Sequence, residues 1–300
     1  MKDGQLTKTV VLLVGDVMVD VIVKPEGALR VGSDRKAKIA LSPGGSAANQ
    51  AVWLAANHVS SRLVARVGRA DIEGLTKQFI GKGVTPNFIA DNERSTGVLV
   101  SMVSEGGERS FFTDRGANEA LCIEDLSENL LDDVGMILLS GYSFFVAEPR
   151  AVALALMARA AEQQIPVLID PSSAGFIKDV GVENFLSWTT GAAILFPNAE
   201  EAALLSGRAG RLEQLETLGQ FYGQVVLTEG ELGASAISAS GDLVHVQAID
   251  SDVVDTTGAG DAFVGGFVSA KISQKSLQEC LQSGAKQGAI AVAKIGAQPS

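Results

Sequence analysis

Short, continuous apolar runs recur along this chain and alternate with segments of helical periodicity. The clearest runs are 10–14, 63–67, 136–139, 167–169, 193–196 and 225–227, and the clearest helical segments are 47–57, 149–164, 212–222 and 277–294. Apolar runs of this length are typical of strands that are buried on both faces of a parallel sheet. Strands that alternate with helices predict an α/β fold: a doubly wound, mostly parallel sheet with helices on both faces.

Two regions depart from this rhythm. Residues 17–40 and 97–113 show strand-like alternation without intervening helices, and 105–108 (EGGE) has the composition of a turn. We interpret the two regions as a small β-sheet lid inserted into a single α/β domain of residues 1–300. An ordinary edge hairpin is the alternative for 97–113.

Composition restricts the partners of the chain. Its 300 residues carry a net charge of −11 and a pI of about 4.7, which disfavours nucleic acid and anionic membrane surfaces. The two cysteines form no disulfide framework, so a reducing, cytoplasmic location is expected. No apolar run reaches the roughly 18 residues that a membrane-spanning helix requires.

The segment 255–263 (DTTGAGDAF) lies between a strand-like stretch, 243–249, and a helical one, 263–272. Glycines at the point where a loop becomes a helix leave backbone N–H groups free to bind phosphate. Asp261 stands beside these groups, where a carboxylate could act on a hydroxyl brought to the phosphate. The helix start should also help to keep Asp261 ionised. This segment indicates phosphoryl transfer.

Polar residues also follow other predicted strands, where open α/β sheets bind their ligands. Each of these segments has a purely structural alternative as a turn, a helix cap or a solvated loop. The segments are Asp16 to Asp20; 43–49 (PGGSAAN), in which Ser46 could cap a helix; Asn198 with Glu201; and 228–233 (TEGELG). Two nucleotide-binding motifs are absent from the sequence, the phosphate loop Gly-x-x-x-x-Gly-Lys-[Ser/Thr] and a Gly-x-Gly-x-x-Gly after the first strand.

Together these segments resemble the signatures of the ribokinase-like (PfkB) carbohydrate kinases. Residues 43–49 resemble the first signature, 255–263 closely resemble the second, and 296–300 (GAQPS) look like the ribokinase tail. Asn198 and Glu201 match the magnesium-associated motif of the family. The resemblance implies a kinase that transfers phosphate from ATP to a primary hydroxyl of a small sugar.

The resemblance also assigns roles to individual residues. Asp261 is implied as the catalytic base, and Gly258, Ala259 and Gly260 as the anion hole. Asp20, Gly44, Gly45 and Asn49 are implied as sugar contacts, and Asn198, Thr228, Gly230 and Gly233 as nucleotide contacts. Glu201 is implied to hold Mg²⁺ through water, and Asp255, Thr257, Ala291, Gly296 and Ser300 to surround an activating potassium ion.

Some features leave the substrate open. Met18 replaces an asparagine typical of ribokinases, which argues against ribose itself, while Arg115 could hold the carboxylate of a sugar acid. A nucleoside kinase of the same superfamily is an alternative, with Phe111, Phe112, Tyr142 and Phe144 as candidates for base stacking. A third hypothesis is a protein that binds a sugar or a nucleotide without catalysis. A homodimer formed through the lid is expected because lid edges and apolar faces need cover.

Overall fold

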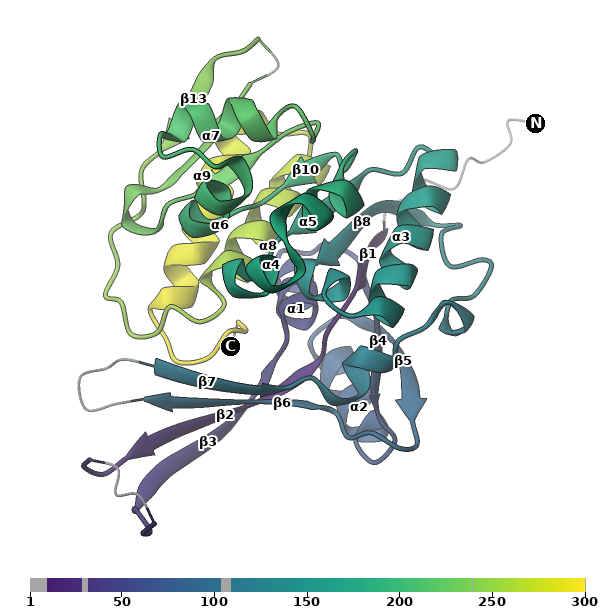
Figure 1. Ribbon diagram of the computed structural model, residues 1–300, viewed down its shortest axis with the longest axis vertical. Coiled ribbons are helices and arrows are strands. Elements are labelled where there is room, and N and C mark those ends of the chain that lie inside the picture. Colours follow the sequence, from purple (N-terminus) through teal and green to yellow (C-terminus); the bar gives the residue numbers. More distant parts are fainter. Residues whose placement is uncertain (1–9, 29–31, 104–108, 239, 300) are drawn as a thin grey trace.

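A six-stranded parallel sheet forms the centre of the protein (Figure 1). The computed structural model describes residues 10–28, 32–103, 109–238 and 240–299. The strands lie in the order β10-β9-β8-β1-β4-β5. Their bounds are β1 Val10–Val14, β4 Ser61–Gly68, β5 Thr85–Asp91, β8 Val134–Ser140, β9 Val167–Asp170 and β10 Ile194–Leu195. The apolar runs at 10–14, 63–67, 136–139 and 167–169 all lie in these strands, as predicted.

An antiparallel sheet extends the central one beyond β10. It consists of β11 (Val226–Thr228), β12 (Ala234–Ile237) and β13 (Leu243–Val246). Two isolated parallel bridges, Leu195 to Val225 and Asn198 to Thr228, join it to the end of β10. The strand at Ala234–Ile237 was not expected from the sequence.

Helices cover both faces of the sheet. In β1, Val11 and Leu13 join one hydrophobic cluster, whereas Leu12 and Val14 join another, because successive side chains of a strand point to opposite faces. The first cluster includes helices α1 (Ser46–Ala56), α2 (Ile72–Gly81), α8 (Ala259–Ile272) and α9 (Leu277–Val292). The second includes α3 (Ala147–Glu162), α4 (Ala174–Val180), α5 (Val182–Thr189), α6 (Ala199–Ser206) and α7 (Arg211–Leu218). The predicted doubly wound arrangement is therefore confirmed.

The two regions predicted as a lid form one separate four-stranded sheet, which projects from the body (Figure 1). Its strands lie in the order β3-β2-β6-β7, with bounds β2 Met18–Pro25, β3 Ala37–Gly44, β6 Gly97–Val103 and β7 Arg109–Asp114. Strand β3 continues to Gly44, beyond the expected end of the lid near residue 40. The expected turn at 105–108 lies outside the described residues.

The register of the lid strands gives it two different faces. Asp20 pairs with Leu99, and Leu99 with Thr113, so these three share the inner face. The outer face carries Ser110 and Asp114 on β7, but its other paired residues include a continuous group of apolar side chains. This apolar group consists of Val21, Val23, Ile39, Leu41, Val100, Met102 and Phe112.

Gly45 allows β3 to run directly into helix α1. Its φ of 97° lies in the region that glycine adopts readily, and an added Cβ would come within 2.5 Å of the carbonyl oxygen of Asp16. The carboxylate of Asp16, just after β1, accepts hydrogen bonds from the backbone N–H groups of Ser46 (3.1 Å) and Ala47 (3.3 Å). The interpretation of Ser46 as the cap was therefore wrong: Ser46 is the first helical residue, and Asp16 binds the free N–H groups.

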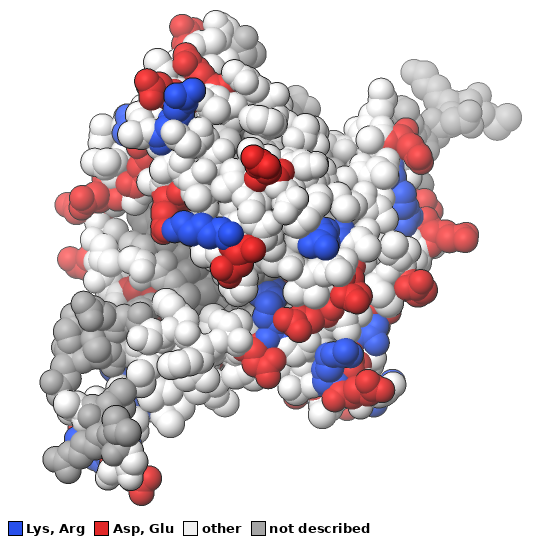
Figure 2. All heavy atoms as spheres, in the orientation of Figure 1, with Lys and Arg blue, Asp and Glu red and all other residues white. Residues whose placement is uncertain are grey.

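The surface carries charges of both signs. On the face shown in Figure 2, Lys and Arg are interspersed with Asp and Glu, and the surface is hollowed between the lid and the body. Within the described residues, no helix is both long enough and apolar enough to cross a membrane.

Candidate active site

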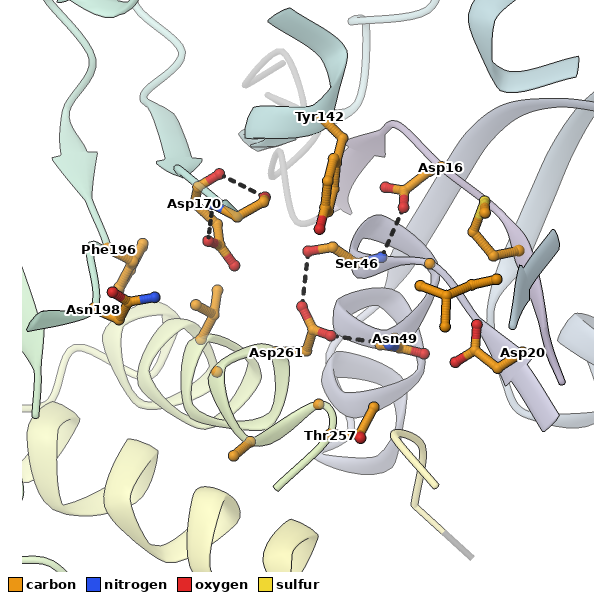
Figure 3. A pocket seen from close by; sticks show the side chains of 18 of the residues that line it. Asp16, Asp20, Ser46, Asn49, Tyr142, Asp170, Phe196, Asn198, Thr257 and Asp261 are labelled. Atoms are coloured by element: carbon orange, nitrogen blue, oxygen red, sulfur yellow. Dashed lines mark hydrogen bonds between the residues drawn. The ribbon is translucent and has the colours of Figure 1, made fainter. Parts of the chain in front are cut away.

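A cavity of about 260 Å³ lies at the carboxyl ends of the central strands, beneath the inner face of the lid (Figure 3). Asp16 follows β1, Asp170 ends β9 and Asp20 lies in the lid strand β2. The start of α8 and the first turns of α1 complete the wall. Segments that are far apart in the sequence therefore bring polar groups to one place.

Asp261 is held by three side chains of helix α1. Its carboxylate accepts hydrogen bonds from Ser46 Oγ (2.8 Å), Asn49 Nδ2 (2.9 Å) and Gln50 Nε2 (3.1 Å). Figure 3 shows Asp261 on α8 facing Ser46 and Asn49 on α1. The carboxylate therefore lies between the N-terminal ends of two helices and is almost completely buried.

Helix α8 begins earlier than the sequence pattern indicated. Gly258 is its N-cap with a left-handed φ of 76°, and an added Cβ would meet Ala297. Ala259 and Gly260 are the first helical residues, so their N–H groups have no partner within the helix, and that of Ala259 donates to the carbonyl of Thr256 just before it at 3.3 Å. Gly258, Ala259 and Gly260, the three residues expected to form an anion hole, all line the cavity next to Asp261.

Asp170 and Gln50 are site residues that sequence reasoning missed. Gln50 Nε2 donates to Asp170 Oδ2 at 2.7 Å as well as to Asp261, so one amide group links the two carboxylates. Gln50 is fully buried. Asp170 directly follows the apolar run 167–169, and this is the same signal that drew attention to Asp16 and Asn198.

Burial, and then the closeness of other acids, raises the pKa values of three acidic residues at the site. Burial, with Glu201 as the next cause, raises the pKa of Asp170 to about 8. Burial raises the pKa of Glu201 to about 7, with a further contribution from Glu200. Burial and then Asp170 raise the pKa of Asp261 well above its ordinary value. The expectation that the helix start keeps Asp261 ionised is thus outweighed by desolvation and by a like charge.

The lid end of the cavity carries Asp20, Asn49 and Arg115. Burial, and then Asp16 and Asp255, raise the pKa of Asp20 to about 6. Arg115 lies 3.9 Å from the Asp16 carboxylate, and its guanidinium stacks 4.4 Å above the ring centre of Tyr142. The arginine is therefore already held by an acid and an aromatic ring.

The two predicted sugar-binding glycines occupy different places. Gly45 lines the cavity. Gly44 lies behind it, where an added Cβ would collide with the Asp20 carboxylate. Gly44 therefore makes room for the Asp20 side chain, and it is not among the residues that line the cavity.

Asn198 and Glu201 form a reciprocal capping box at the start of α6. The backbone N–H of Asn198 donates to Glu201 Oε2, and that of Glu201 donates to Asn198 Oδ1, both at 2.9 Å. The pair therefore does form a helix cap, which was the structural alternative for it. Both residues also line the cavity opposite Asp261. No group of three or more His, Cys, Asp or Glu side chains among the described residues could hold a metal ion directly.

A second cavity, of about 640 Å³, adjoins the first. It shares Thr228, Thr256, Ala259 and Gly260 with the first cavity. Its other walls come from α8, α9 and the β13–α8 connection and include Phe263, Val253, Ala289 and Val292, together with the predicted residues Gly230 and Gly233. The start of α8 thus lies between a cavity lined by several acidic and amide side chains and a largely apolar one.

The residues proposed for a monovalent cation lie around Asp255. The Asp255 carboxylate accepts hydrogen bonds from the N–H groups of Thr257 (2.8 Å) and Gly296 (3.2 Å). The N–H of Asp255 donates to the carbonyl of Val292, the neighbour of Ala291. These members of the predicted set are therefore brought together, while Ser300 lies outside the described residues.

The aromatic residues considered for base stacking do not gather at the site. Tyr142 lines the first cavity. Phe144 is fully buried in the core, whereas Phe111 and Phe112 are more than half exposed on the lid. A single ring, Tyr142, remains at the site from this group.

The arrangement can orient a hydroxyl against a carboxylate and present backbone N–H groups to an anion beside it.

Comparison with known proteins also indicates a kinase. The profile of the pfkB family carbohydrate kinases matches residues 8–300. An ATP-dependent ribose-1-phosphate kinase of Halopiger xanaduensis is 28% identical over 285 residues, which cover 93% of this chain and 88% of that protein.

Solved structures agree with the fold. Ribokinase of Thermotoga maritima superimposes with a TM-score of 0.81 at 26% identity, covering 97% of this chain and 95% of that one. Adenosine kinase of Sinorhizobium meliloti superimposes with a TM-score of 0.86 at 23% identity, covering 97% and 96%. Since the family match extends over nearly the whole chain, the protein belongs to the pfkB family of carbohydrate kinases.

Proposed function

We propose that residues 1–300 act as one kinase unit that transfers the terminal phosphoryl group of ATP to a primary hydroxyl of a small sugar or sugar derivative. The observation that carries this proposal is the position of Asp261. Its carboxylate lines the first cavity, beneath the lid, at the start of α8. The neighbouring residues Ala259 and Gly260 also border the second, largely apolar cavity. An acceptor hydroxyl and a nucleotide can therefore approach the same helix end from two sides.

In this proposal Asp261 accepts the proton of the acceptor hydroxyl as the phosphoryl group is transferred. Phosphoryl transfer has a loose transition state, so orientation of the hydroxyl matters more than its full deprotonation. A base is most effective when its pKa lies near the working pH, which suits the raised pKa of Asp261. The N–H groups of Gly258, Ala259 and Gly260 stabilise the charge that develops on the phosphate.

The sugar is proposed to bind between the body and the inner face of the lid. Asp20 and Asn49 can bind hydroxyl groups there, and Asp20 reaches the cavity because Gly44 leaves space behind it. Arg115 is the one Lys or Arg among the described residues that line the two cavities. Because it already pairs with Asp16, we propose a neutral sugar ahead of a sugar acid.

ATP is proposed to occupy the second cavity, with its phosphates directed toward Gly258 to Gly260. Thr228, Gly230 and Gly233 border that path. Asp170 and Glu201 fit a hydrated Mg²⁺, because two desolvated carboxylates with raised pKa values gain from a nearby divalent cation. Mg²⁺ keeps several of its waters, so two carboxylates are sufficient, and it would screen the phosphate charges.

A coupled assay of ADP release over pentoses, hexoses, keto-sugar acids and nucleosides tests the function. We expect turnover with at least one neutral sugar and a fall of about 10²- to 10⁴-fold in kcat for Asp261→Asn, because the proton acceptor is lost. ATP binding should persist in the variant. Turnover with nucleosides alone would favour the nucleoside kinase. A lack of turnover together with ligand binding would favour a binding protein, and unchanged kcat in Asp261→Asn would exclude the mechanism.

Asp170→Asn should stabilise the protein while lowering its activity. The pKa of Asp170 is raised from 3.8 to about 8, so the folded state holds a proton that the unfolded state releases between pH 4 and 8. This side chain therefore destabilises the fold increasingly as the pH rises through that range. We expect the gain in Tm for Asp170→Asn to be larger at pH 8 than at pH 5, measured by differential scanning calorimetry. An equal gain at both pH values would contradict the prediction.

Potassium is proposed to bind beside Asp255. A cation there would offset the charge of a buried carboxylate, which also contributes to the raised pKa of Asp20. Replacing potassium with tetramethylammonium at constant ionic strength should lower kcat several-fold. An unchanged rate would remove the cation from the proposal.

The lid is proposed to form a homodimer through its outer face. Leu41 and Phe112 are 72% and 62% exposed, and β3 and β7 are the unpaired edges of the lid sheet. Leu41→Glu should shift the mass measured by light scattering from dimer to monomer. Lys38→Glu is the control: it changes the charge on the opposite face of β3, three residues before Leu41, and should leave the dimer intact. A monomeric wild-type protein would contradict the prediction.

A further inference from the structure

We propose that Lys82 and Gln298 are positioning residues that fix the amide of Asn49 so that its nitrogen faces Asp261. The proposal rests on the proposed role of Asp261 as the base. It concerns a lysine after helix α2 and a glutamine in the C-terminal tail, neither of which touches the cavity.

Three consecutive hydrogen bonds connect these residues. Lys82 Nζ donates to Gln298 Oε1 at 2.5 Å, and Gln298 Nε2 donates to Asn49 Oδ1 at 3.0 Å. Asn49 Nδ2 then donates to Asp261 Oδ2 at 2.9 Å. Four segments that are distant in the sequence thus form one chain, from a half-buried ammonium group to a buried carboxylate.

The Lys82 end of the chain imposes one direction on the amides that follow it. An ammonium group can only donate, whereas each amide has one donating and one accepting end. Lys82 requires the oxygen of Gln298, so the nitrogen of Gln298 faces Asn49 and the nitrogen of Asn49 faces Asp261. Reversing either amide alone would bring two oxygens or two NH₂ groups together.

The direction of the Asn49 amide matters for the base. Asn49 is one of three donors to Asp261, and its hydrogen bond lowers the pKa of a carboxyl that burial and Asp170 raise. If the amide were reversed, its oxygen would face the carboxylate and repel it. A hydrogen bond to a buried charged group is worth a factor of about 10 to 100 in an equilibrium.

The tail is anchored independently of the Gln298 side chain. Trp53 Nε1 donates to the carbonyl of Ala297 at 2.9 Å, and Lys294 Nζ lies 5.4 Å from the centre of the Trp53 ring. Both contacts are made to α1, the helix that carries Asn49. A substitution of Gln298 therefore tests the hydrogen-bond chain while these anchors remain.

A charge-exchange experiment tests the direction of the chain. Lys82→Glu places an acceptor where a donor stood, so Gln298 should reverse and Asn49 should follow. We expect kcat to fall about 10-fold or more, with little change in KM for ATP. Adding Gln298→Lys should restore most of kcat, because the new ammonium group can donate both to Asn49 and to the new carboxylate.

Lys77→Glu is the matched control. Lys77 is exposed on the same helix, α2, and the substitution makes the same change of charge. It should leave kcat unchanged. Lys82→Met removes the donor without reversing the charge, so it should lower kcat less than Lys82→Glu does. It replaces Lys82→Glu in the experiment if that variant does not fold.

Two kinetic outcomes would overturn the proposal. The first is a kcat in Lys82→Glu, or in Lys82→Met if that variant is needed, equal to that of Lys77→Glu. The second is a loss in Lys82→Glu that Gln298→Lys does not recover.

Because the proposal rests on the proposed function, the side-chain amide NMR signals of Asn49 and Gln298 provide a readout without turnover. They should shift in Lys82→Glu and stay in place in Lys77→Glu. Unmoved signals would overturn the positioning role even if Asp261→Asn proves the base.

Discussion

The contact between two helix starts, through the Asp261 carboxylate, is the interaction on which the site depends. Helix α8 supplies the acid, and α1 supplies Ser46, Asn49 and Gln50 as its donors. Each helix is in turn fixed at its N-terminus: α1 by Asp16 after the central strand β1, and α8 by the packing of Gly258 against Ala297. The Asp261 carboxylate is therefore positioned by the sheet and by the tail together.

Electrostatics at this site oppose folding and favour ligands. Asp170, Glu201 and Asp261 are desolvated acids whose pKa values all lie above their ordinary values. With a net charge of −11, the protein cannot attract a nucleotide through its overall field. Anion binding must therefore come from helix N–H groups and from cations that accompany the ligand. The same cations would reduce the repulsion among the acids.

Much of the architecture could be predicted from the sequence because buried strands and helix starts leave local patterns. Apolar runs such as 10–14 and 63–67 marked the sheet, and the glycines in 255–263 marked the start of helix α8. Strand β12 was missed because Ala234–Ile237 is short and contains Ser235, which interrupts the apolar run. The true cap of α1 was missed because Asp16 is separated from it by 30 residues.

The remaining site residues lacked a local signal of their role. Gln50 lies in an Ala-rich helix and looks like any polar helical residue, yet the fold buries it between two acids. Lys82 and Gln298 are 216 positions apart, and only the packing of the tail against α1 brings them together. Asp170 did have a signal, its position after a buried strand, but no second residue nearby reinforced it.

The position of the tail has a practical consequence for handling the protein. Gln298 contacts Asn49, so any affinity tag or fluorescent partner joined directly after Pro299 would begin a few bonds from the support of the proposed base. Strand β1 runs toward the site, so its first residue, Val10, lies at the end of this central strand that points away from the cavity. Fusions and surface immobilisation should therefore be made through the N-terminal side, which leaves the C-terminal residues free to pack.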